Sequence, residues 1–161
     1  MSAPGLRPLG ARHVTLHPGD VACGTRGDRF DTLLGSCVAV VLTDPRRTVG
    51  AMCHIVHATS GRRPQPDSSF GDVALDLMYE QLRALGAVPQ CCLAFVYGGG
   101  NMFPGLVSGG GDVGSANADW VLAALAADGV QVVHSDLGGT SYRRLRWTVG
   151  PDDPEVTAVA V

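Results

Sequence analysis

The sequence lacks any continuous apolar run of the roughly 18 residues that a membrane-spanning helix requires. Its opening residues, MSAPGLRPLG, also lack the apolar stretch that forms the core of a secretion signal. From these two absences we expect a soluble cytoplasmic protein with no membrane insertion.

An excess of positive charge is missing as well. The chain has 12 Lys and Arg residues against 15 Asp and Glu residues, which gives a formal net charge of −3. The arginines form separated pairs, and we expect the pair Arg143-Arg144 and the acidic pair Asp152-Asp153 to lie on solvated faces. Because nucleic-acid-binding domains typically concentrate basic residues on one face, the sequence predicts no nucleic-acid partner.

The five cysteines include no C-x-x-C pair, and their number is odd. A disulfide framework typically uses an even number of cysteines, and a zinc site typically uses closely spaced ones, so the sequence predicts neither. We expect reduced thiols, no metal and no cofactor.

One glycine motif resembles a nucleotide-binding fingerprint. Gly109, Gly111 and Gly114 satisfy G-x-G-x-x-G, and a predicted helix follows from Ser115. Only the short stretch 106–108 precedes the motif, where a dinucleotide-binding unit requires a full strand. We therefore favour turns and close backbone packing over a dinucleotide site at this position.

Hydrophobic periodicity predicts β-strands interrupted by two helices. A length of 161 residues predicts a single domain. The expected elements are short strands within 14–22 and at 29–34, a β-hairpin of 37–43 and 49–57, a helix over Asp72–Leu85, a strand over 92–97, a helix over Ser115–Asp128, strands over 130–135 and 142–149, and a final edge strand. Asp72 and Ser115 are the expected N-caps, and Gly86 and Gly129 the expected helix stops. This order predicts an α/β fold with mixed, largely antiparallel sheets.

The hairpin brings a cysteine and a histidine onto neighbouring strands. If DPRR, at 44–47, forms the loop with its proline at the first central position of a type I turn, Thr43 pairs with Thr48. In that register Cys37 lies directly opposite His54, and directly opposed side chains have Cβ atoms about 4.5–5.5 Å apart. An imidazole at this distance can take a thiol proton, which is how a cysteine nucleophile is activated.

The hypothesis depends on this register. A loop one residue longer or shorter would place Cys37 opposite Cys53 or Ile55 and turn the histidine to the other face. Gly35 and Ser36 are small, so a substrate backbone can approach the cysteine, and amides near Cys37 are candidates for an oxyanion hole. The alternative is that the cysteine is a small buried hydrophobic residue and the histidine a hydrogen-bonded residue at a strand edge.

Several short motifs follow one another along nearly the whole chain. They are TLLGSCVAV at 32–40, DP at 44–45, VGAMCH at 49–54, FGDVAL at 70–75, GGGNMF at 98–103, VGSANADWV at 113–121 and DLGG at 136–139, which the basic RRLRW follows. Together they resemble the CheD family of chemoreceptor glutamine deamidases. The resemblance implies a three-layer α/β/β sandwich and a single CheD-like deamidase domain over residues 1–161, with residues 1–12 flexible.

The resemblance also implies an activity. Family members hydrolyse the side-chain amides of specific glutamines on methyl-accepting chemotaxis receptors to glutamate and release ammonia. By this resemblance Cys37 is the nucleophile and His54 the general base. A CheC-type phosphatase is a further partner that the resemblance implies. The alternative is a non-catalytic chemotaxis adaptor that binds receptors or such a phosphatase, which the presence of both Cys37 and His54 disfavours.

The third catalytic residue stays open between two neighbours. The resemblance places a threonine six positions before the cysteine, where this chain has Asp31, and Thr32 lies one position later. Because side chains alternate along a strand, only one of them can face the histidine, and we favour Thr32. The expected substrate-binding residues are Gly35, Ser36, Gly98 and Gly99. For the glycine run 98–100, the alternative is that tight turns and close backbone packing require glycine.

Overall fold

The structure is a computed structural model that describes residues 11–105 and 112–159. Its elements, in chain order, are β1 (His13–Thr15), β2 (Val21–Thr25), β3 (Arg29–Leu34), β4 (Val38–Thr43), β5 (Val49–Ile55), α1 (Gly71–Ala84), the short 3-10 helix η1 (Pro89–Cys91), β6 (Leu93–Gly98), α2 (Val113–Ala127), β7 (Gln131–Leu137), β8 (Tyr142–Thr148) and β9 (Glu155–Val159). Most of the segment 1–12 expected to be flexible lies outside the described residues, as do Gly109 and Gly111 of the glycine motif.

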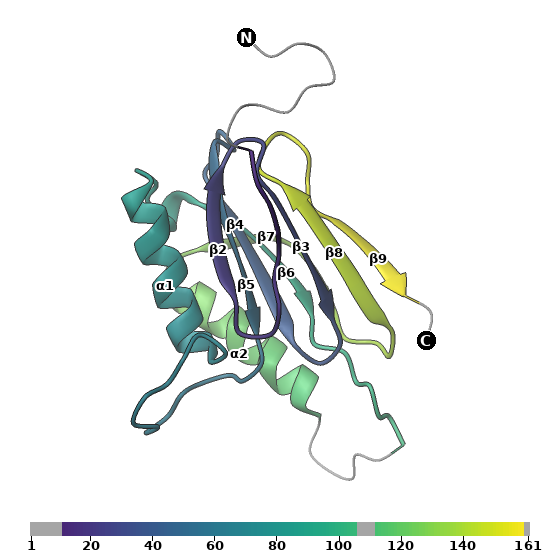
Figure 1. The fold of residues 1–161 in the computed structure, drawn as a ribbon. Helices are drawn as coiled ribbons and strands as arrows, with labels where there is room; N and C mark the ends of the chain where they lie inside the picture. The colour runs from purple at the N-terminus through teal and green to yellow at the C-terminus, as the bar shows by residue number, and fades with distance from the viewer. Residues whose placement is uncertain (1–10, 106–111, 160–161) are drawn as a thin grey trace.

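The strands of the described residues form two sheets (Figure 1). The five-stranded sheet has the order β2-β5-β4-β6-β7, and the four-stranded sheet has the order β1-β3-β8-β9. Neighbouring strands run antiparallel except in the pairs β1–β3 and β6–β7, which are parallel. The predicted α/β fold with mixed, largely antiparallel sheets is therefore confirmed, and the last strand lies at a sheet edge as expected.

The central strand of the five-stranded sheet, β4, is buried on both faces. Val38, Val40 and Leu42 belong to the core that packs against α1 and α2. The alternate residues Ala39 and Val41 belong to a second core, which side chains of β3 and β8 complete. The helices, the five-stranded sheet and the four-stranded sheet therefore stack in that order, with both helices on one side of the molecule (Figure 1). Burial on both faces explains the continuous apolar run of this strand.

Both helices lie where the sequence predicts them, but their caps differ. In α1 the N-cap position is Phe70, and Asp72 lies inside the first turn, where its carboxylate accepts from the Ser60 amide and hydroxyl at 3.0 and 2.6 Å. In α2 the N-cap is Asp112, which accepts from the Ser115 amide at 2.8 Å. The predicted caps Asp72 and Ser115 are therefore wrong, because each lies within the helix. None of the helices in the described part of the chain is long and apolar enough to cross a membrane.

The predicted hairpin is present, but its predicted register is wrong. Thr43 pairs with Gly50 rather than with Thr48, and Ala39 pairs with His54. The cause is the Asp44 carboxylate, which accepts from the amides of Thr48 and Val49 at 2.7 and 3.0 Å and thereby lengthens the connection. The register shifts by two residues, an even number, so the side-chain faces are kept. Cys37 therefore lies just before β4, diagonal to His54 rather than opposite it.

Candidate active site

His54 lies near the end of β5, and its side chain points toward the four-stranded sheet. There the hydroxyl oxygen of Thr32, on β3, lies 2.7 Å from His54 Nδ1. Both residues are only 2% exposed. The register explains this contact, because His54 pairs with Ala39, whose side chain lies in the core between the two sheets. A histidine from one sheet and a threonine from the other thus form one buried polar group.

A second hydrogen bond assigns the proton on the imidazole. The Thr32 hydroxyl also lies 2.7 Å from the carbonyl oxygen of Leu16, which can only accept a hydrogen bond. A hydroxyl has a single hydrogen, so Thr32 donates to Leu16 and accepts from His54 Nδ1–H. This assignment leaves Nε2 of the neutral ring without a proton. His54 therefore has a lone pair at the nitrogen that faces away from Thr32.

The same environment keeps the imidazole neutral. Burial lowers the pKa of His54 to about 4, and the nearby charges of Asp20 and His17 act in opposite directions on it. A neutral imidazole with an unprotonated Nε2 has the protonation state that a general base requires.

Asp31, the other candidate for the third position, lies on the opposite face of β3. Its carboxylate oxygen Oδ2 is 2.5 Å from His13 Nε2 on the outer side of the four-stranded sheet. Alternation along the strand therefore brings Thr32 and not Asp31 to His54. This is the arrangement that the sequence favoured between its two alternatives.

Cys37 lies in the short connection between β3 and β4, and it packs against the core between the two sheets. This is the same side of the five-stranded sheet from which His54 projects. Burial raises the pKa of the Cys37 thiol, so the resting group is a thiol rather than a thiolate. Cys53 and Cys92 belong instead to the core under the helices, where burial raises the pKa of the Cys53 thiol to about 12.

The glycine run 98–100, which begins at the last residue of β6, packs against the backbone of Cys37. The Gly99 amide donates to the Cys37 carbonyl at 2.9 Å, and the Gly100 amide donates to the Gly35 carbonyl at 3.0 Å. Gly98 has a φ of 109°, and a Cβ built on it would lie 2.2 Å from the Cys37 carbonyl oxygen. Only glycine fits this approach without a shift of the backbone. Close backbone packing thus accounts for Gly98 and Gly99, and their expected contact with substrate stays a prediction.

A small apolar pocket lies beside Ser36, the residue that precedes Cys37. Its volume is about 220 Å³, and Ser36, Met102, Phe103 and Val113 are among the residues that line it. Phe103 and Val113 are 65% and 64% exposed, the largest values among the exposed apolar side chains of the described residues. The pocket places Ser36 at a surface that a substrate can reach. Phe103 belongs to the GGGNMF motif and Val113 is the first residue of the VGSANADWV motif, but neither is among the substrate-binding residues that the sequence predicts.

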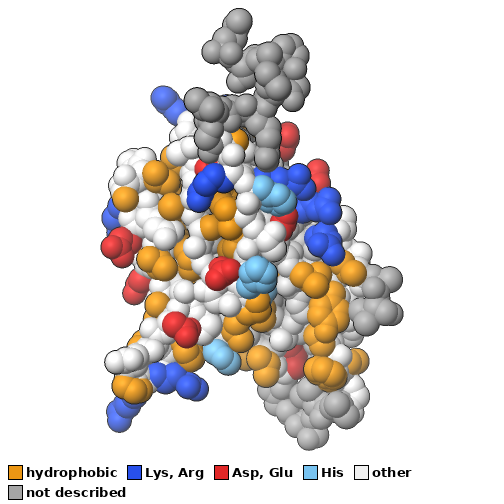
Figure 2. All heavy atoms as spheres, in the orientation of Figure 1, with side chains coloured by type: hydrophobic (Ala, Val, Ile, Leu, Met, Phe, Trp, Pro, Cys, Tyr) orange, Lys and Arg blue, Asp and Glu red, His pale blue; other side chains and the backbone are white. Residues whose placement is uncertain are grey.

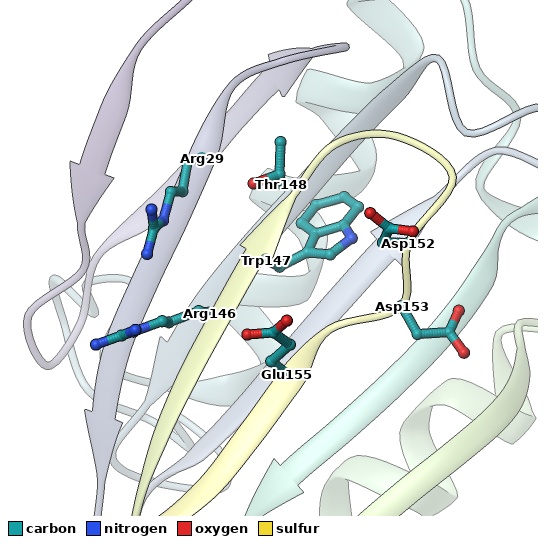
Figure 3. A pocket seen from close by; sticks show the side chains of 7 residues that line it. All are labelled: Arg29, Arg146, Trp147, Thr148, Asp152, Asp153 and Glu155. Atoms are coloured by element: carbon teal, nitrogen blue, oxygen red, sulfur yellow. The ribbon is translucent and has the colours of Figure 1, made fainter. Parts of the chain in front are cut away.

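Another hollow, of about 190 Å³, lies where β3, β8 and β9 come together (Figure 3). Its lining consists of Arg29, Arg146, Trp147, Thr148, Asp152, Asp153 and Glu155. These side chains include no cysteine and no histidine, so this hollow has neither the thiol nor the imidazole of the group around Cys37. Figure 2 shows basic side chains gathered near this part of the four-stranded sheet, beside acidic and histidine side chains.

The paired charges expected on solvated faces differ in their burial. Asp152, Asp153 and Arg144 are exposed as expected, but Arg143 is only 9% exposed. The prediction for Arg143 is therefore wrong. Alternation along β8 places this side chain on the same face as the buried Leu145.

Comparison with known proteins finds a protein family whose model matches most of this chain. The family model described as CheD chemotactic sensory transduction matches residues 57–156. This range includes the glycine run and Arg143 but begins after Cys37 and His54.

Three similar curated proteins are each named as a probable chemoreceptor glutamine deamidase CheD. The protein from Albidiferax ferrireducens is 37% identical over 144 residues, which cover 87% of this chain and 83% of the relative. The protein from Pseudomonas fluorescens is 36% identical over 142 residues, with 86% and 80% covered. The protein from Dechloromonas aromatica is 33% identical over 148 residues, with 91% and 87% covered.

Proposed function

The chain belongs to the CheD family, and we propose that it hydrolyses the side-chain amides of specific glutamines on chemotaxis receptors to glutamate. In this proposal Cys37 is the nucleophile, His54 the general base, and Thr32 the residue that holds the imidazole. The observation that carries the proposal is the hydrogen-bond chain from Leu16 through Thr32 to His54, which leaves Nε2 unprotonated on the side of the sheet where Cys37 packs.

The reaction begins from a neutral pair. Because burial raises the pKa of Cys37 and lowers the pKa of His54, the thiol keeps its proton until the substrate is bound. His54 Nε2 then takes this proton as the sulfur attacks the amide carbon of the glutamine. In the tetrahedral intermediate, the imidazolium returns the proton to the amide nitrogen, which leaves as ammonia and gives a thioester on Cys37.

Hydrolysis of the thioester completes the cycle. A water molecule loses a proton to His54 Nε2 and attacks the thioester carbon, and the sulfur leaves as a thiol after it regains that proton. The receptor side chain is released as glutamate. Throughout these steps His54 Nδ1–H stays bonded to the Thr32 hydroxyl, which fixes the ring orientation without adding a negative charge.

The apolar pocket beside Ser36 is the surface that we expect to receive the receptor segment around the target glutamine. Its exposed Phe103 and Val113 offer apolar contact in the pocket that Ser36, the neighbour of Cys37, also lines. Binding of a CheC-type phosphatase and a cytoplasmic location also follow from this role, and both are parts of the proposal.

The proposal is tested on the cytoplasmic fragment of a chemotaxis receptor from the same organism. The purified protein is incubated with the fragment, and conversion of glutamine to glutamate is mapped by peptide mass spectrometry. We expect conversion by the parent protein and by Cys91→Ala, which changes an exposed cysteine, and none by Cys37→Ala or His54→Ala.

Two outcomes would contradict the proposal in different ways. Conversion that survives Cys37→Ala would identify a different nucleophile. Absence of conversion by the parent protein, together with full receptor binding and full chemotaxis in cells that carry Cys37→Ala, would favour the non-catalytic adaptor.

A further inference from the structure

Arg143 occupies a position on β8 that the strand pattern assigns to a core residue. Burial alternates along β8, and Arg143 shares the buried face with Leu145 and Trp147. Its neighbour Arg144 is exposed. A buried guanidinium is unfavourable unless hydrogen bonds replace its water, so its partners indicate what this side chain does.

The guanidinium of Arg143 binds the backbone of two loops. One terminal nitrogen donates to the Gly138 carbonyl at 2.8 Å and to Asp136 Oδ1 at 3.2 Å, and the other donates to the Gly98 carbonyl at 3.3 Å. Gly98 ends β6 and Gly138 follows β7. An arginine side chain suits this task because its planar group directs several donors at once in fixed directions.

The same two loops hold the backbone around Cys37. The Gly138 amide donates to the Gly98 carbonyl at 2.9 Å, and the next glycine in the run, Gly99, donates to the Cys37 carbonyl at 2.9 Å. A parallel link runs from the Asn101 amide to the Gly139 carbonyl at 2.8 Å. An unbroken series of hydrogen bonds therefore connects Arg143 to the peptide group of Cys37.

Apart from their backbone groups, the glycines of these loops have nothing that holds them in place. Gly98, Gly99, Gly138 and Gly139 have φ values of 109°, 63°, 85° and 71°, and glycines contribute no side chains to packing. Glycine also has the largest backbone entropy to lose when a loop is ordered. The hydrogen bonds from Arg143 thus supply order that the glycine residues themselves do not.

We propose that Arg143 is a positioning residue for Cys37, because it fixes the glycine run and the loop after β7 against the peptide groups that hold the nucleophile. This inference rests on the proposed function, in which Cys37 attacks the substrate. Arg143 itself touches no reacting atom. Removal of its guanidinium therefore loosens the backbone at Cys37 and lowers the rate of attack.

The test compares Arg143→Met, Arg143→Lys and the exposed control Arg144→Met on the same strand. For each variant, kcat and KM are measured on the receptor fragment at a temperature where circular dichroism shows it folded. A misplacement of about 1 Å can lower a rate by about 100-fold. For Arg143→Met we therefore expect kcat to fall by about 10- to 100-fold, and KM to change by a smaller factor because Gly100 of the same run and the next residue, Asn101, line the apolar pocket. Arg143→Lys should be intermediate, and Arg144→Met should equal the parent.

A second readout is independent of turnover. The rate at which iodoacetamide alkylates Cys37 is followed by peptide mass spectrometry in the same variants. Cys37 is half-buried, so a looser loop should raise its alkylation rate in Arg143→Met while kcat falls. Arg144→Met should change neither quantity. A role limited to stability would lower the melting temperature and leave both quantities unchanged.

The outcomes separate this inference from the proposed function. If the parent converts glutamine and folded Arg143→Met keeps the parental kcat, the positioning role is wrong. A higher KM at constant kcat would overturn it too, because Arg143 would then contact the substrate. If the parent itself is inactive, the proposed function fails. The alkylation rate then still tests the positioning role, and an unchanged rate in Arg143→Met and Arg143→Lys would overturn it. Should Arg143→Met not fold, Arg143→Lys gives the same comparisons.

Discussion

At the scale of single residues, the direction of one hydrogen bond determines what His54 can do. Thr32 has one hydroxyl hydrogen, and the Leu16 carbonyl takes it. The histidine must then donate through Nδ1, which frees Nε2 for the thiol. A carboxylate at this position would also accept from Nδ1, but it would hold the imidazolium more tightly than a hydroxyl does. The threonine therefore suits a base whose pKa is low.

Replacement of Thr32 by valine tests this role, because valine keeps the shape of the side chain and removes the hydroxyl. Without the acceptor, Nδ1–H is buried and unpaired, and the other tautomer, with the proton on Nε2, becomes competitive. We expect kcat on the receptor fragment to fall on the order of 100-fold in Thr32→Val. Thr32→Ser restores a hydroxyl and should retain most of the activity. Equal activities of the valine and serine variants would show that the hydroxyl has no part in the reaction.

The pH dependence of the reaction follows from the lowered pKa of His54. Only the neutral imidazole accepts the thiol proton, so activity is lost as pH falls through the pKa of the folded protein, about 4. We expect kcat/KM to stay level down to about pH 5 and to decline below it. The measurement is a profile of kcat/KM with the folded fraction monitored at each pH. A half-loss near the ordinary histidine value of about 6.5 would mean that water reaches the imidazole in the active protein.

At the scale of elements, the glycine run and the β3–β4 connection are held at a distance that excludes a side chain. Gly98 and Gly86 offer a matched comparison, because both have positive φ values, 109° and 88°. A Cβ on Gly98 would lie 2.2 Å from the Cys37 carbonyl oxygen, whereas a Cβ on Gly86 would meet nothing within 4 Å. Alanine would therefore adopt an unfavourable positive φ at either site, but only alanine at position 98 would also clash with the Cys37 carbonyl oxygen.

We expect Gly98→Ala to lower both the free energy of unfolding and kcat, and Gly86→Ala to lower only the former. The clash should make Gly98→Ala less stable than Gly86→Ala by about 1–3 kcal/mol in urea titrations. Its kcat should fall about tenfold or more, because the peptide group of Cys37 must move. Equal stabilities for the two variants would show that the loop adapts to the extra carbon without strain.

The elements themselves could be predicted from the sequence, but their register and caps could not. The β-branched run before DPRR indicates a strand, and the spacing of apolar residues indicates the helices. The pairing of Thr43 depends on which amides the Asp44 carboxylate binds, and this choice is made by the folded loop. Alternation showed only that one of Thr32 and Asp31 could face His54, and the structure has Thr32 there, the residue that the sequence analysis favoured. Alternation with Leu145 also marks Arg143 as inward-facing, but a doubled arginine is more often solvated, so the sequence prediction failed there.

At the scale of the whole molecule, the stacking of two sheets determines the chemistry of the site. His54 projects from one sheet and Thr32 from the other, and Cys37 lies in the connection that joins strands of both. The layer between the sheets excludes water, and this exclusion shifts the pKa of the thiol upward and that of the imidazole downward. Any opening of the sheets would therefore raise the pKa of His54 and weaken the fold together. Stability and protonation of His54 must then be linked.

The linkage predicts how stability changes with pH. An unfolded His54 binds a proton below about pH 6.5, whereas the folded protein resists protonation until about pH 4. Between these values the unfolded state binds more protons, so the free energy of unfolding decreases as pH falls from 6.5 to about 4. The difference between these two pKa values contributes at most about 3 kcal/mol to the free energy of unfolding, and this contribution is fully present above about pH 6.5.

His54→Gln isolates this contribution, because glutamine can still hydrogen-bond to Thr32 but does not titrate. Urea unfolding curves for the parent and the variant are compared from about pH 7 to about pH 4. Carboxylates and the other histidines titrate in both proteins and cancel in the difference. The stability of the parent should therefore fall toward that of the variant, or below it, as the pH decreases. Parallel curves over the whole range would contradict a buried, neutral His54, and with it the neutral thiol and imidazole from which the proposed reaction starts.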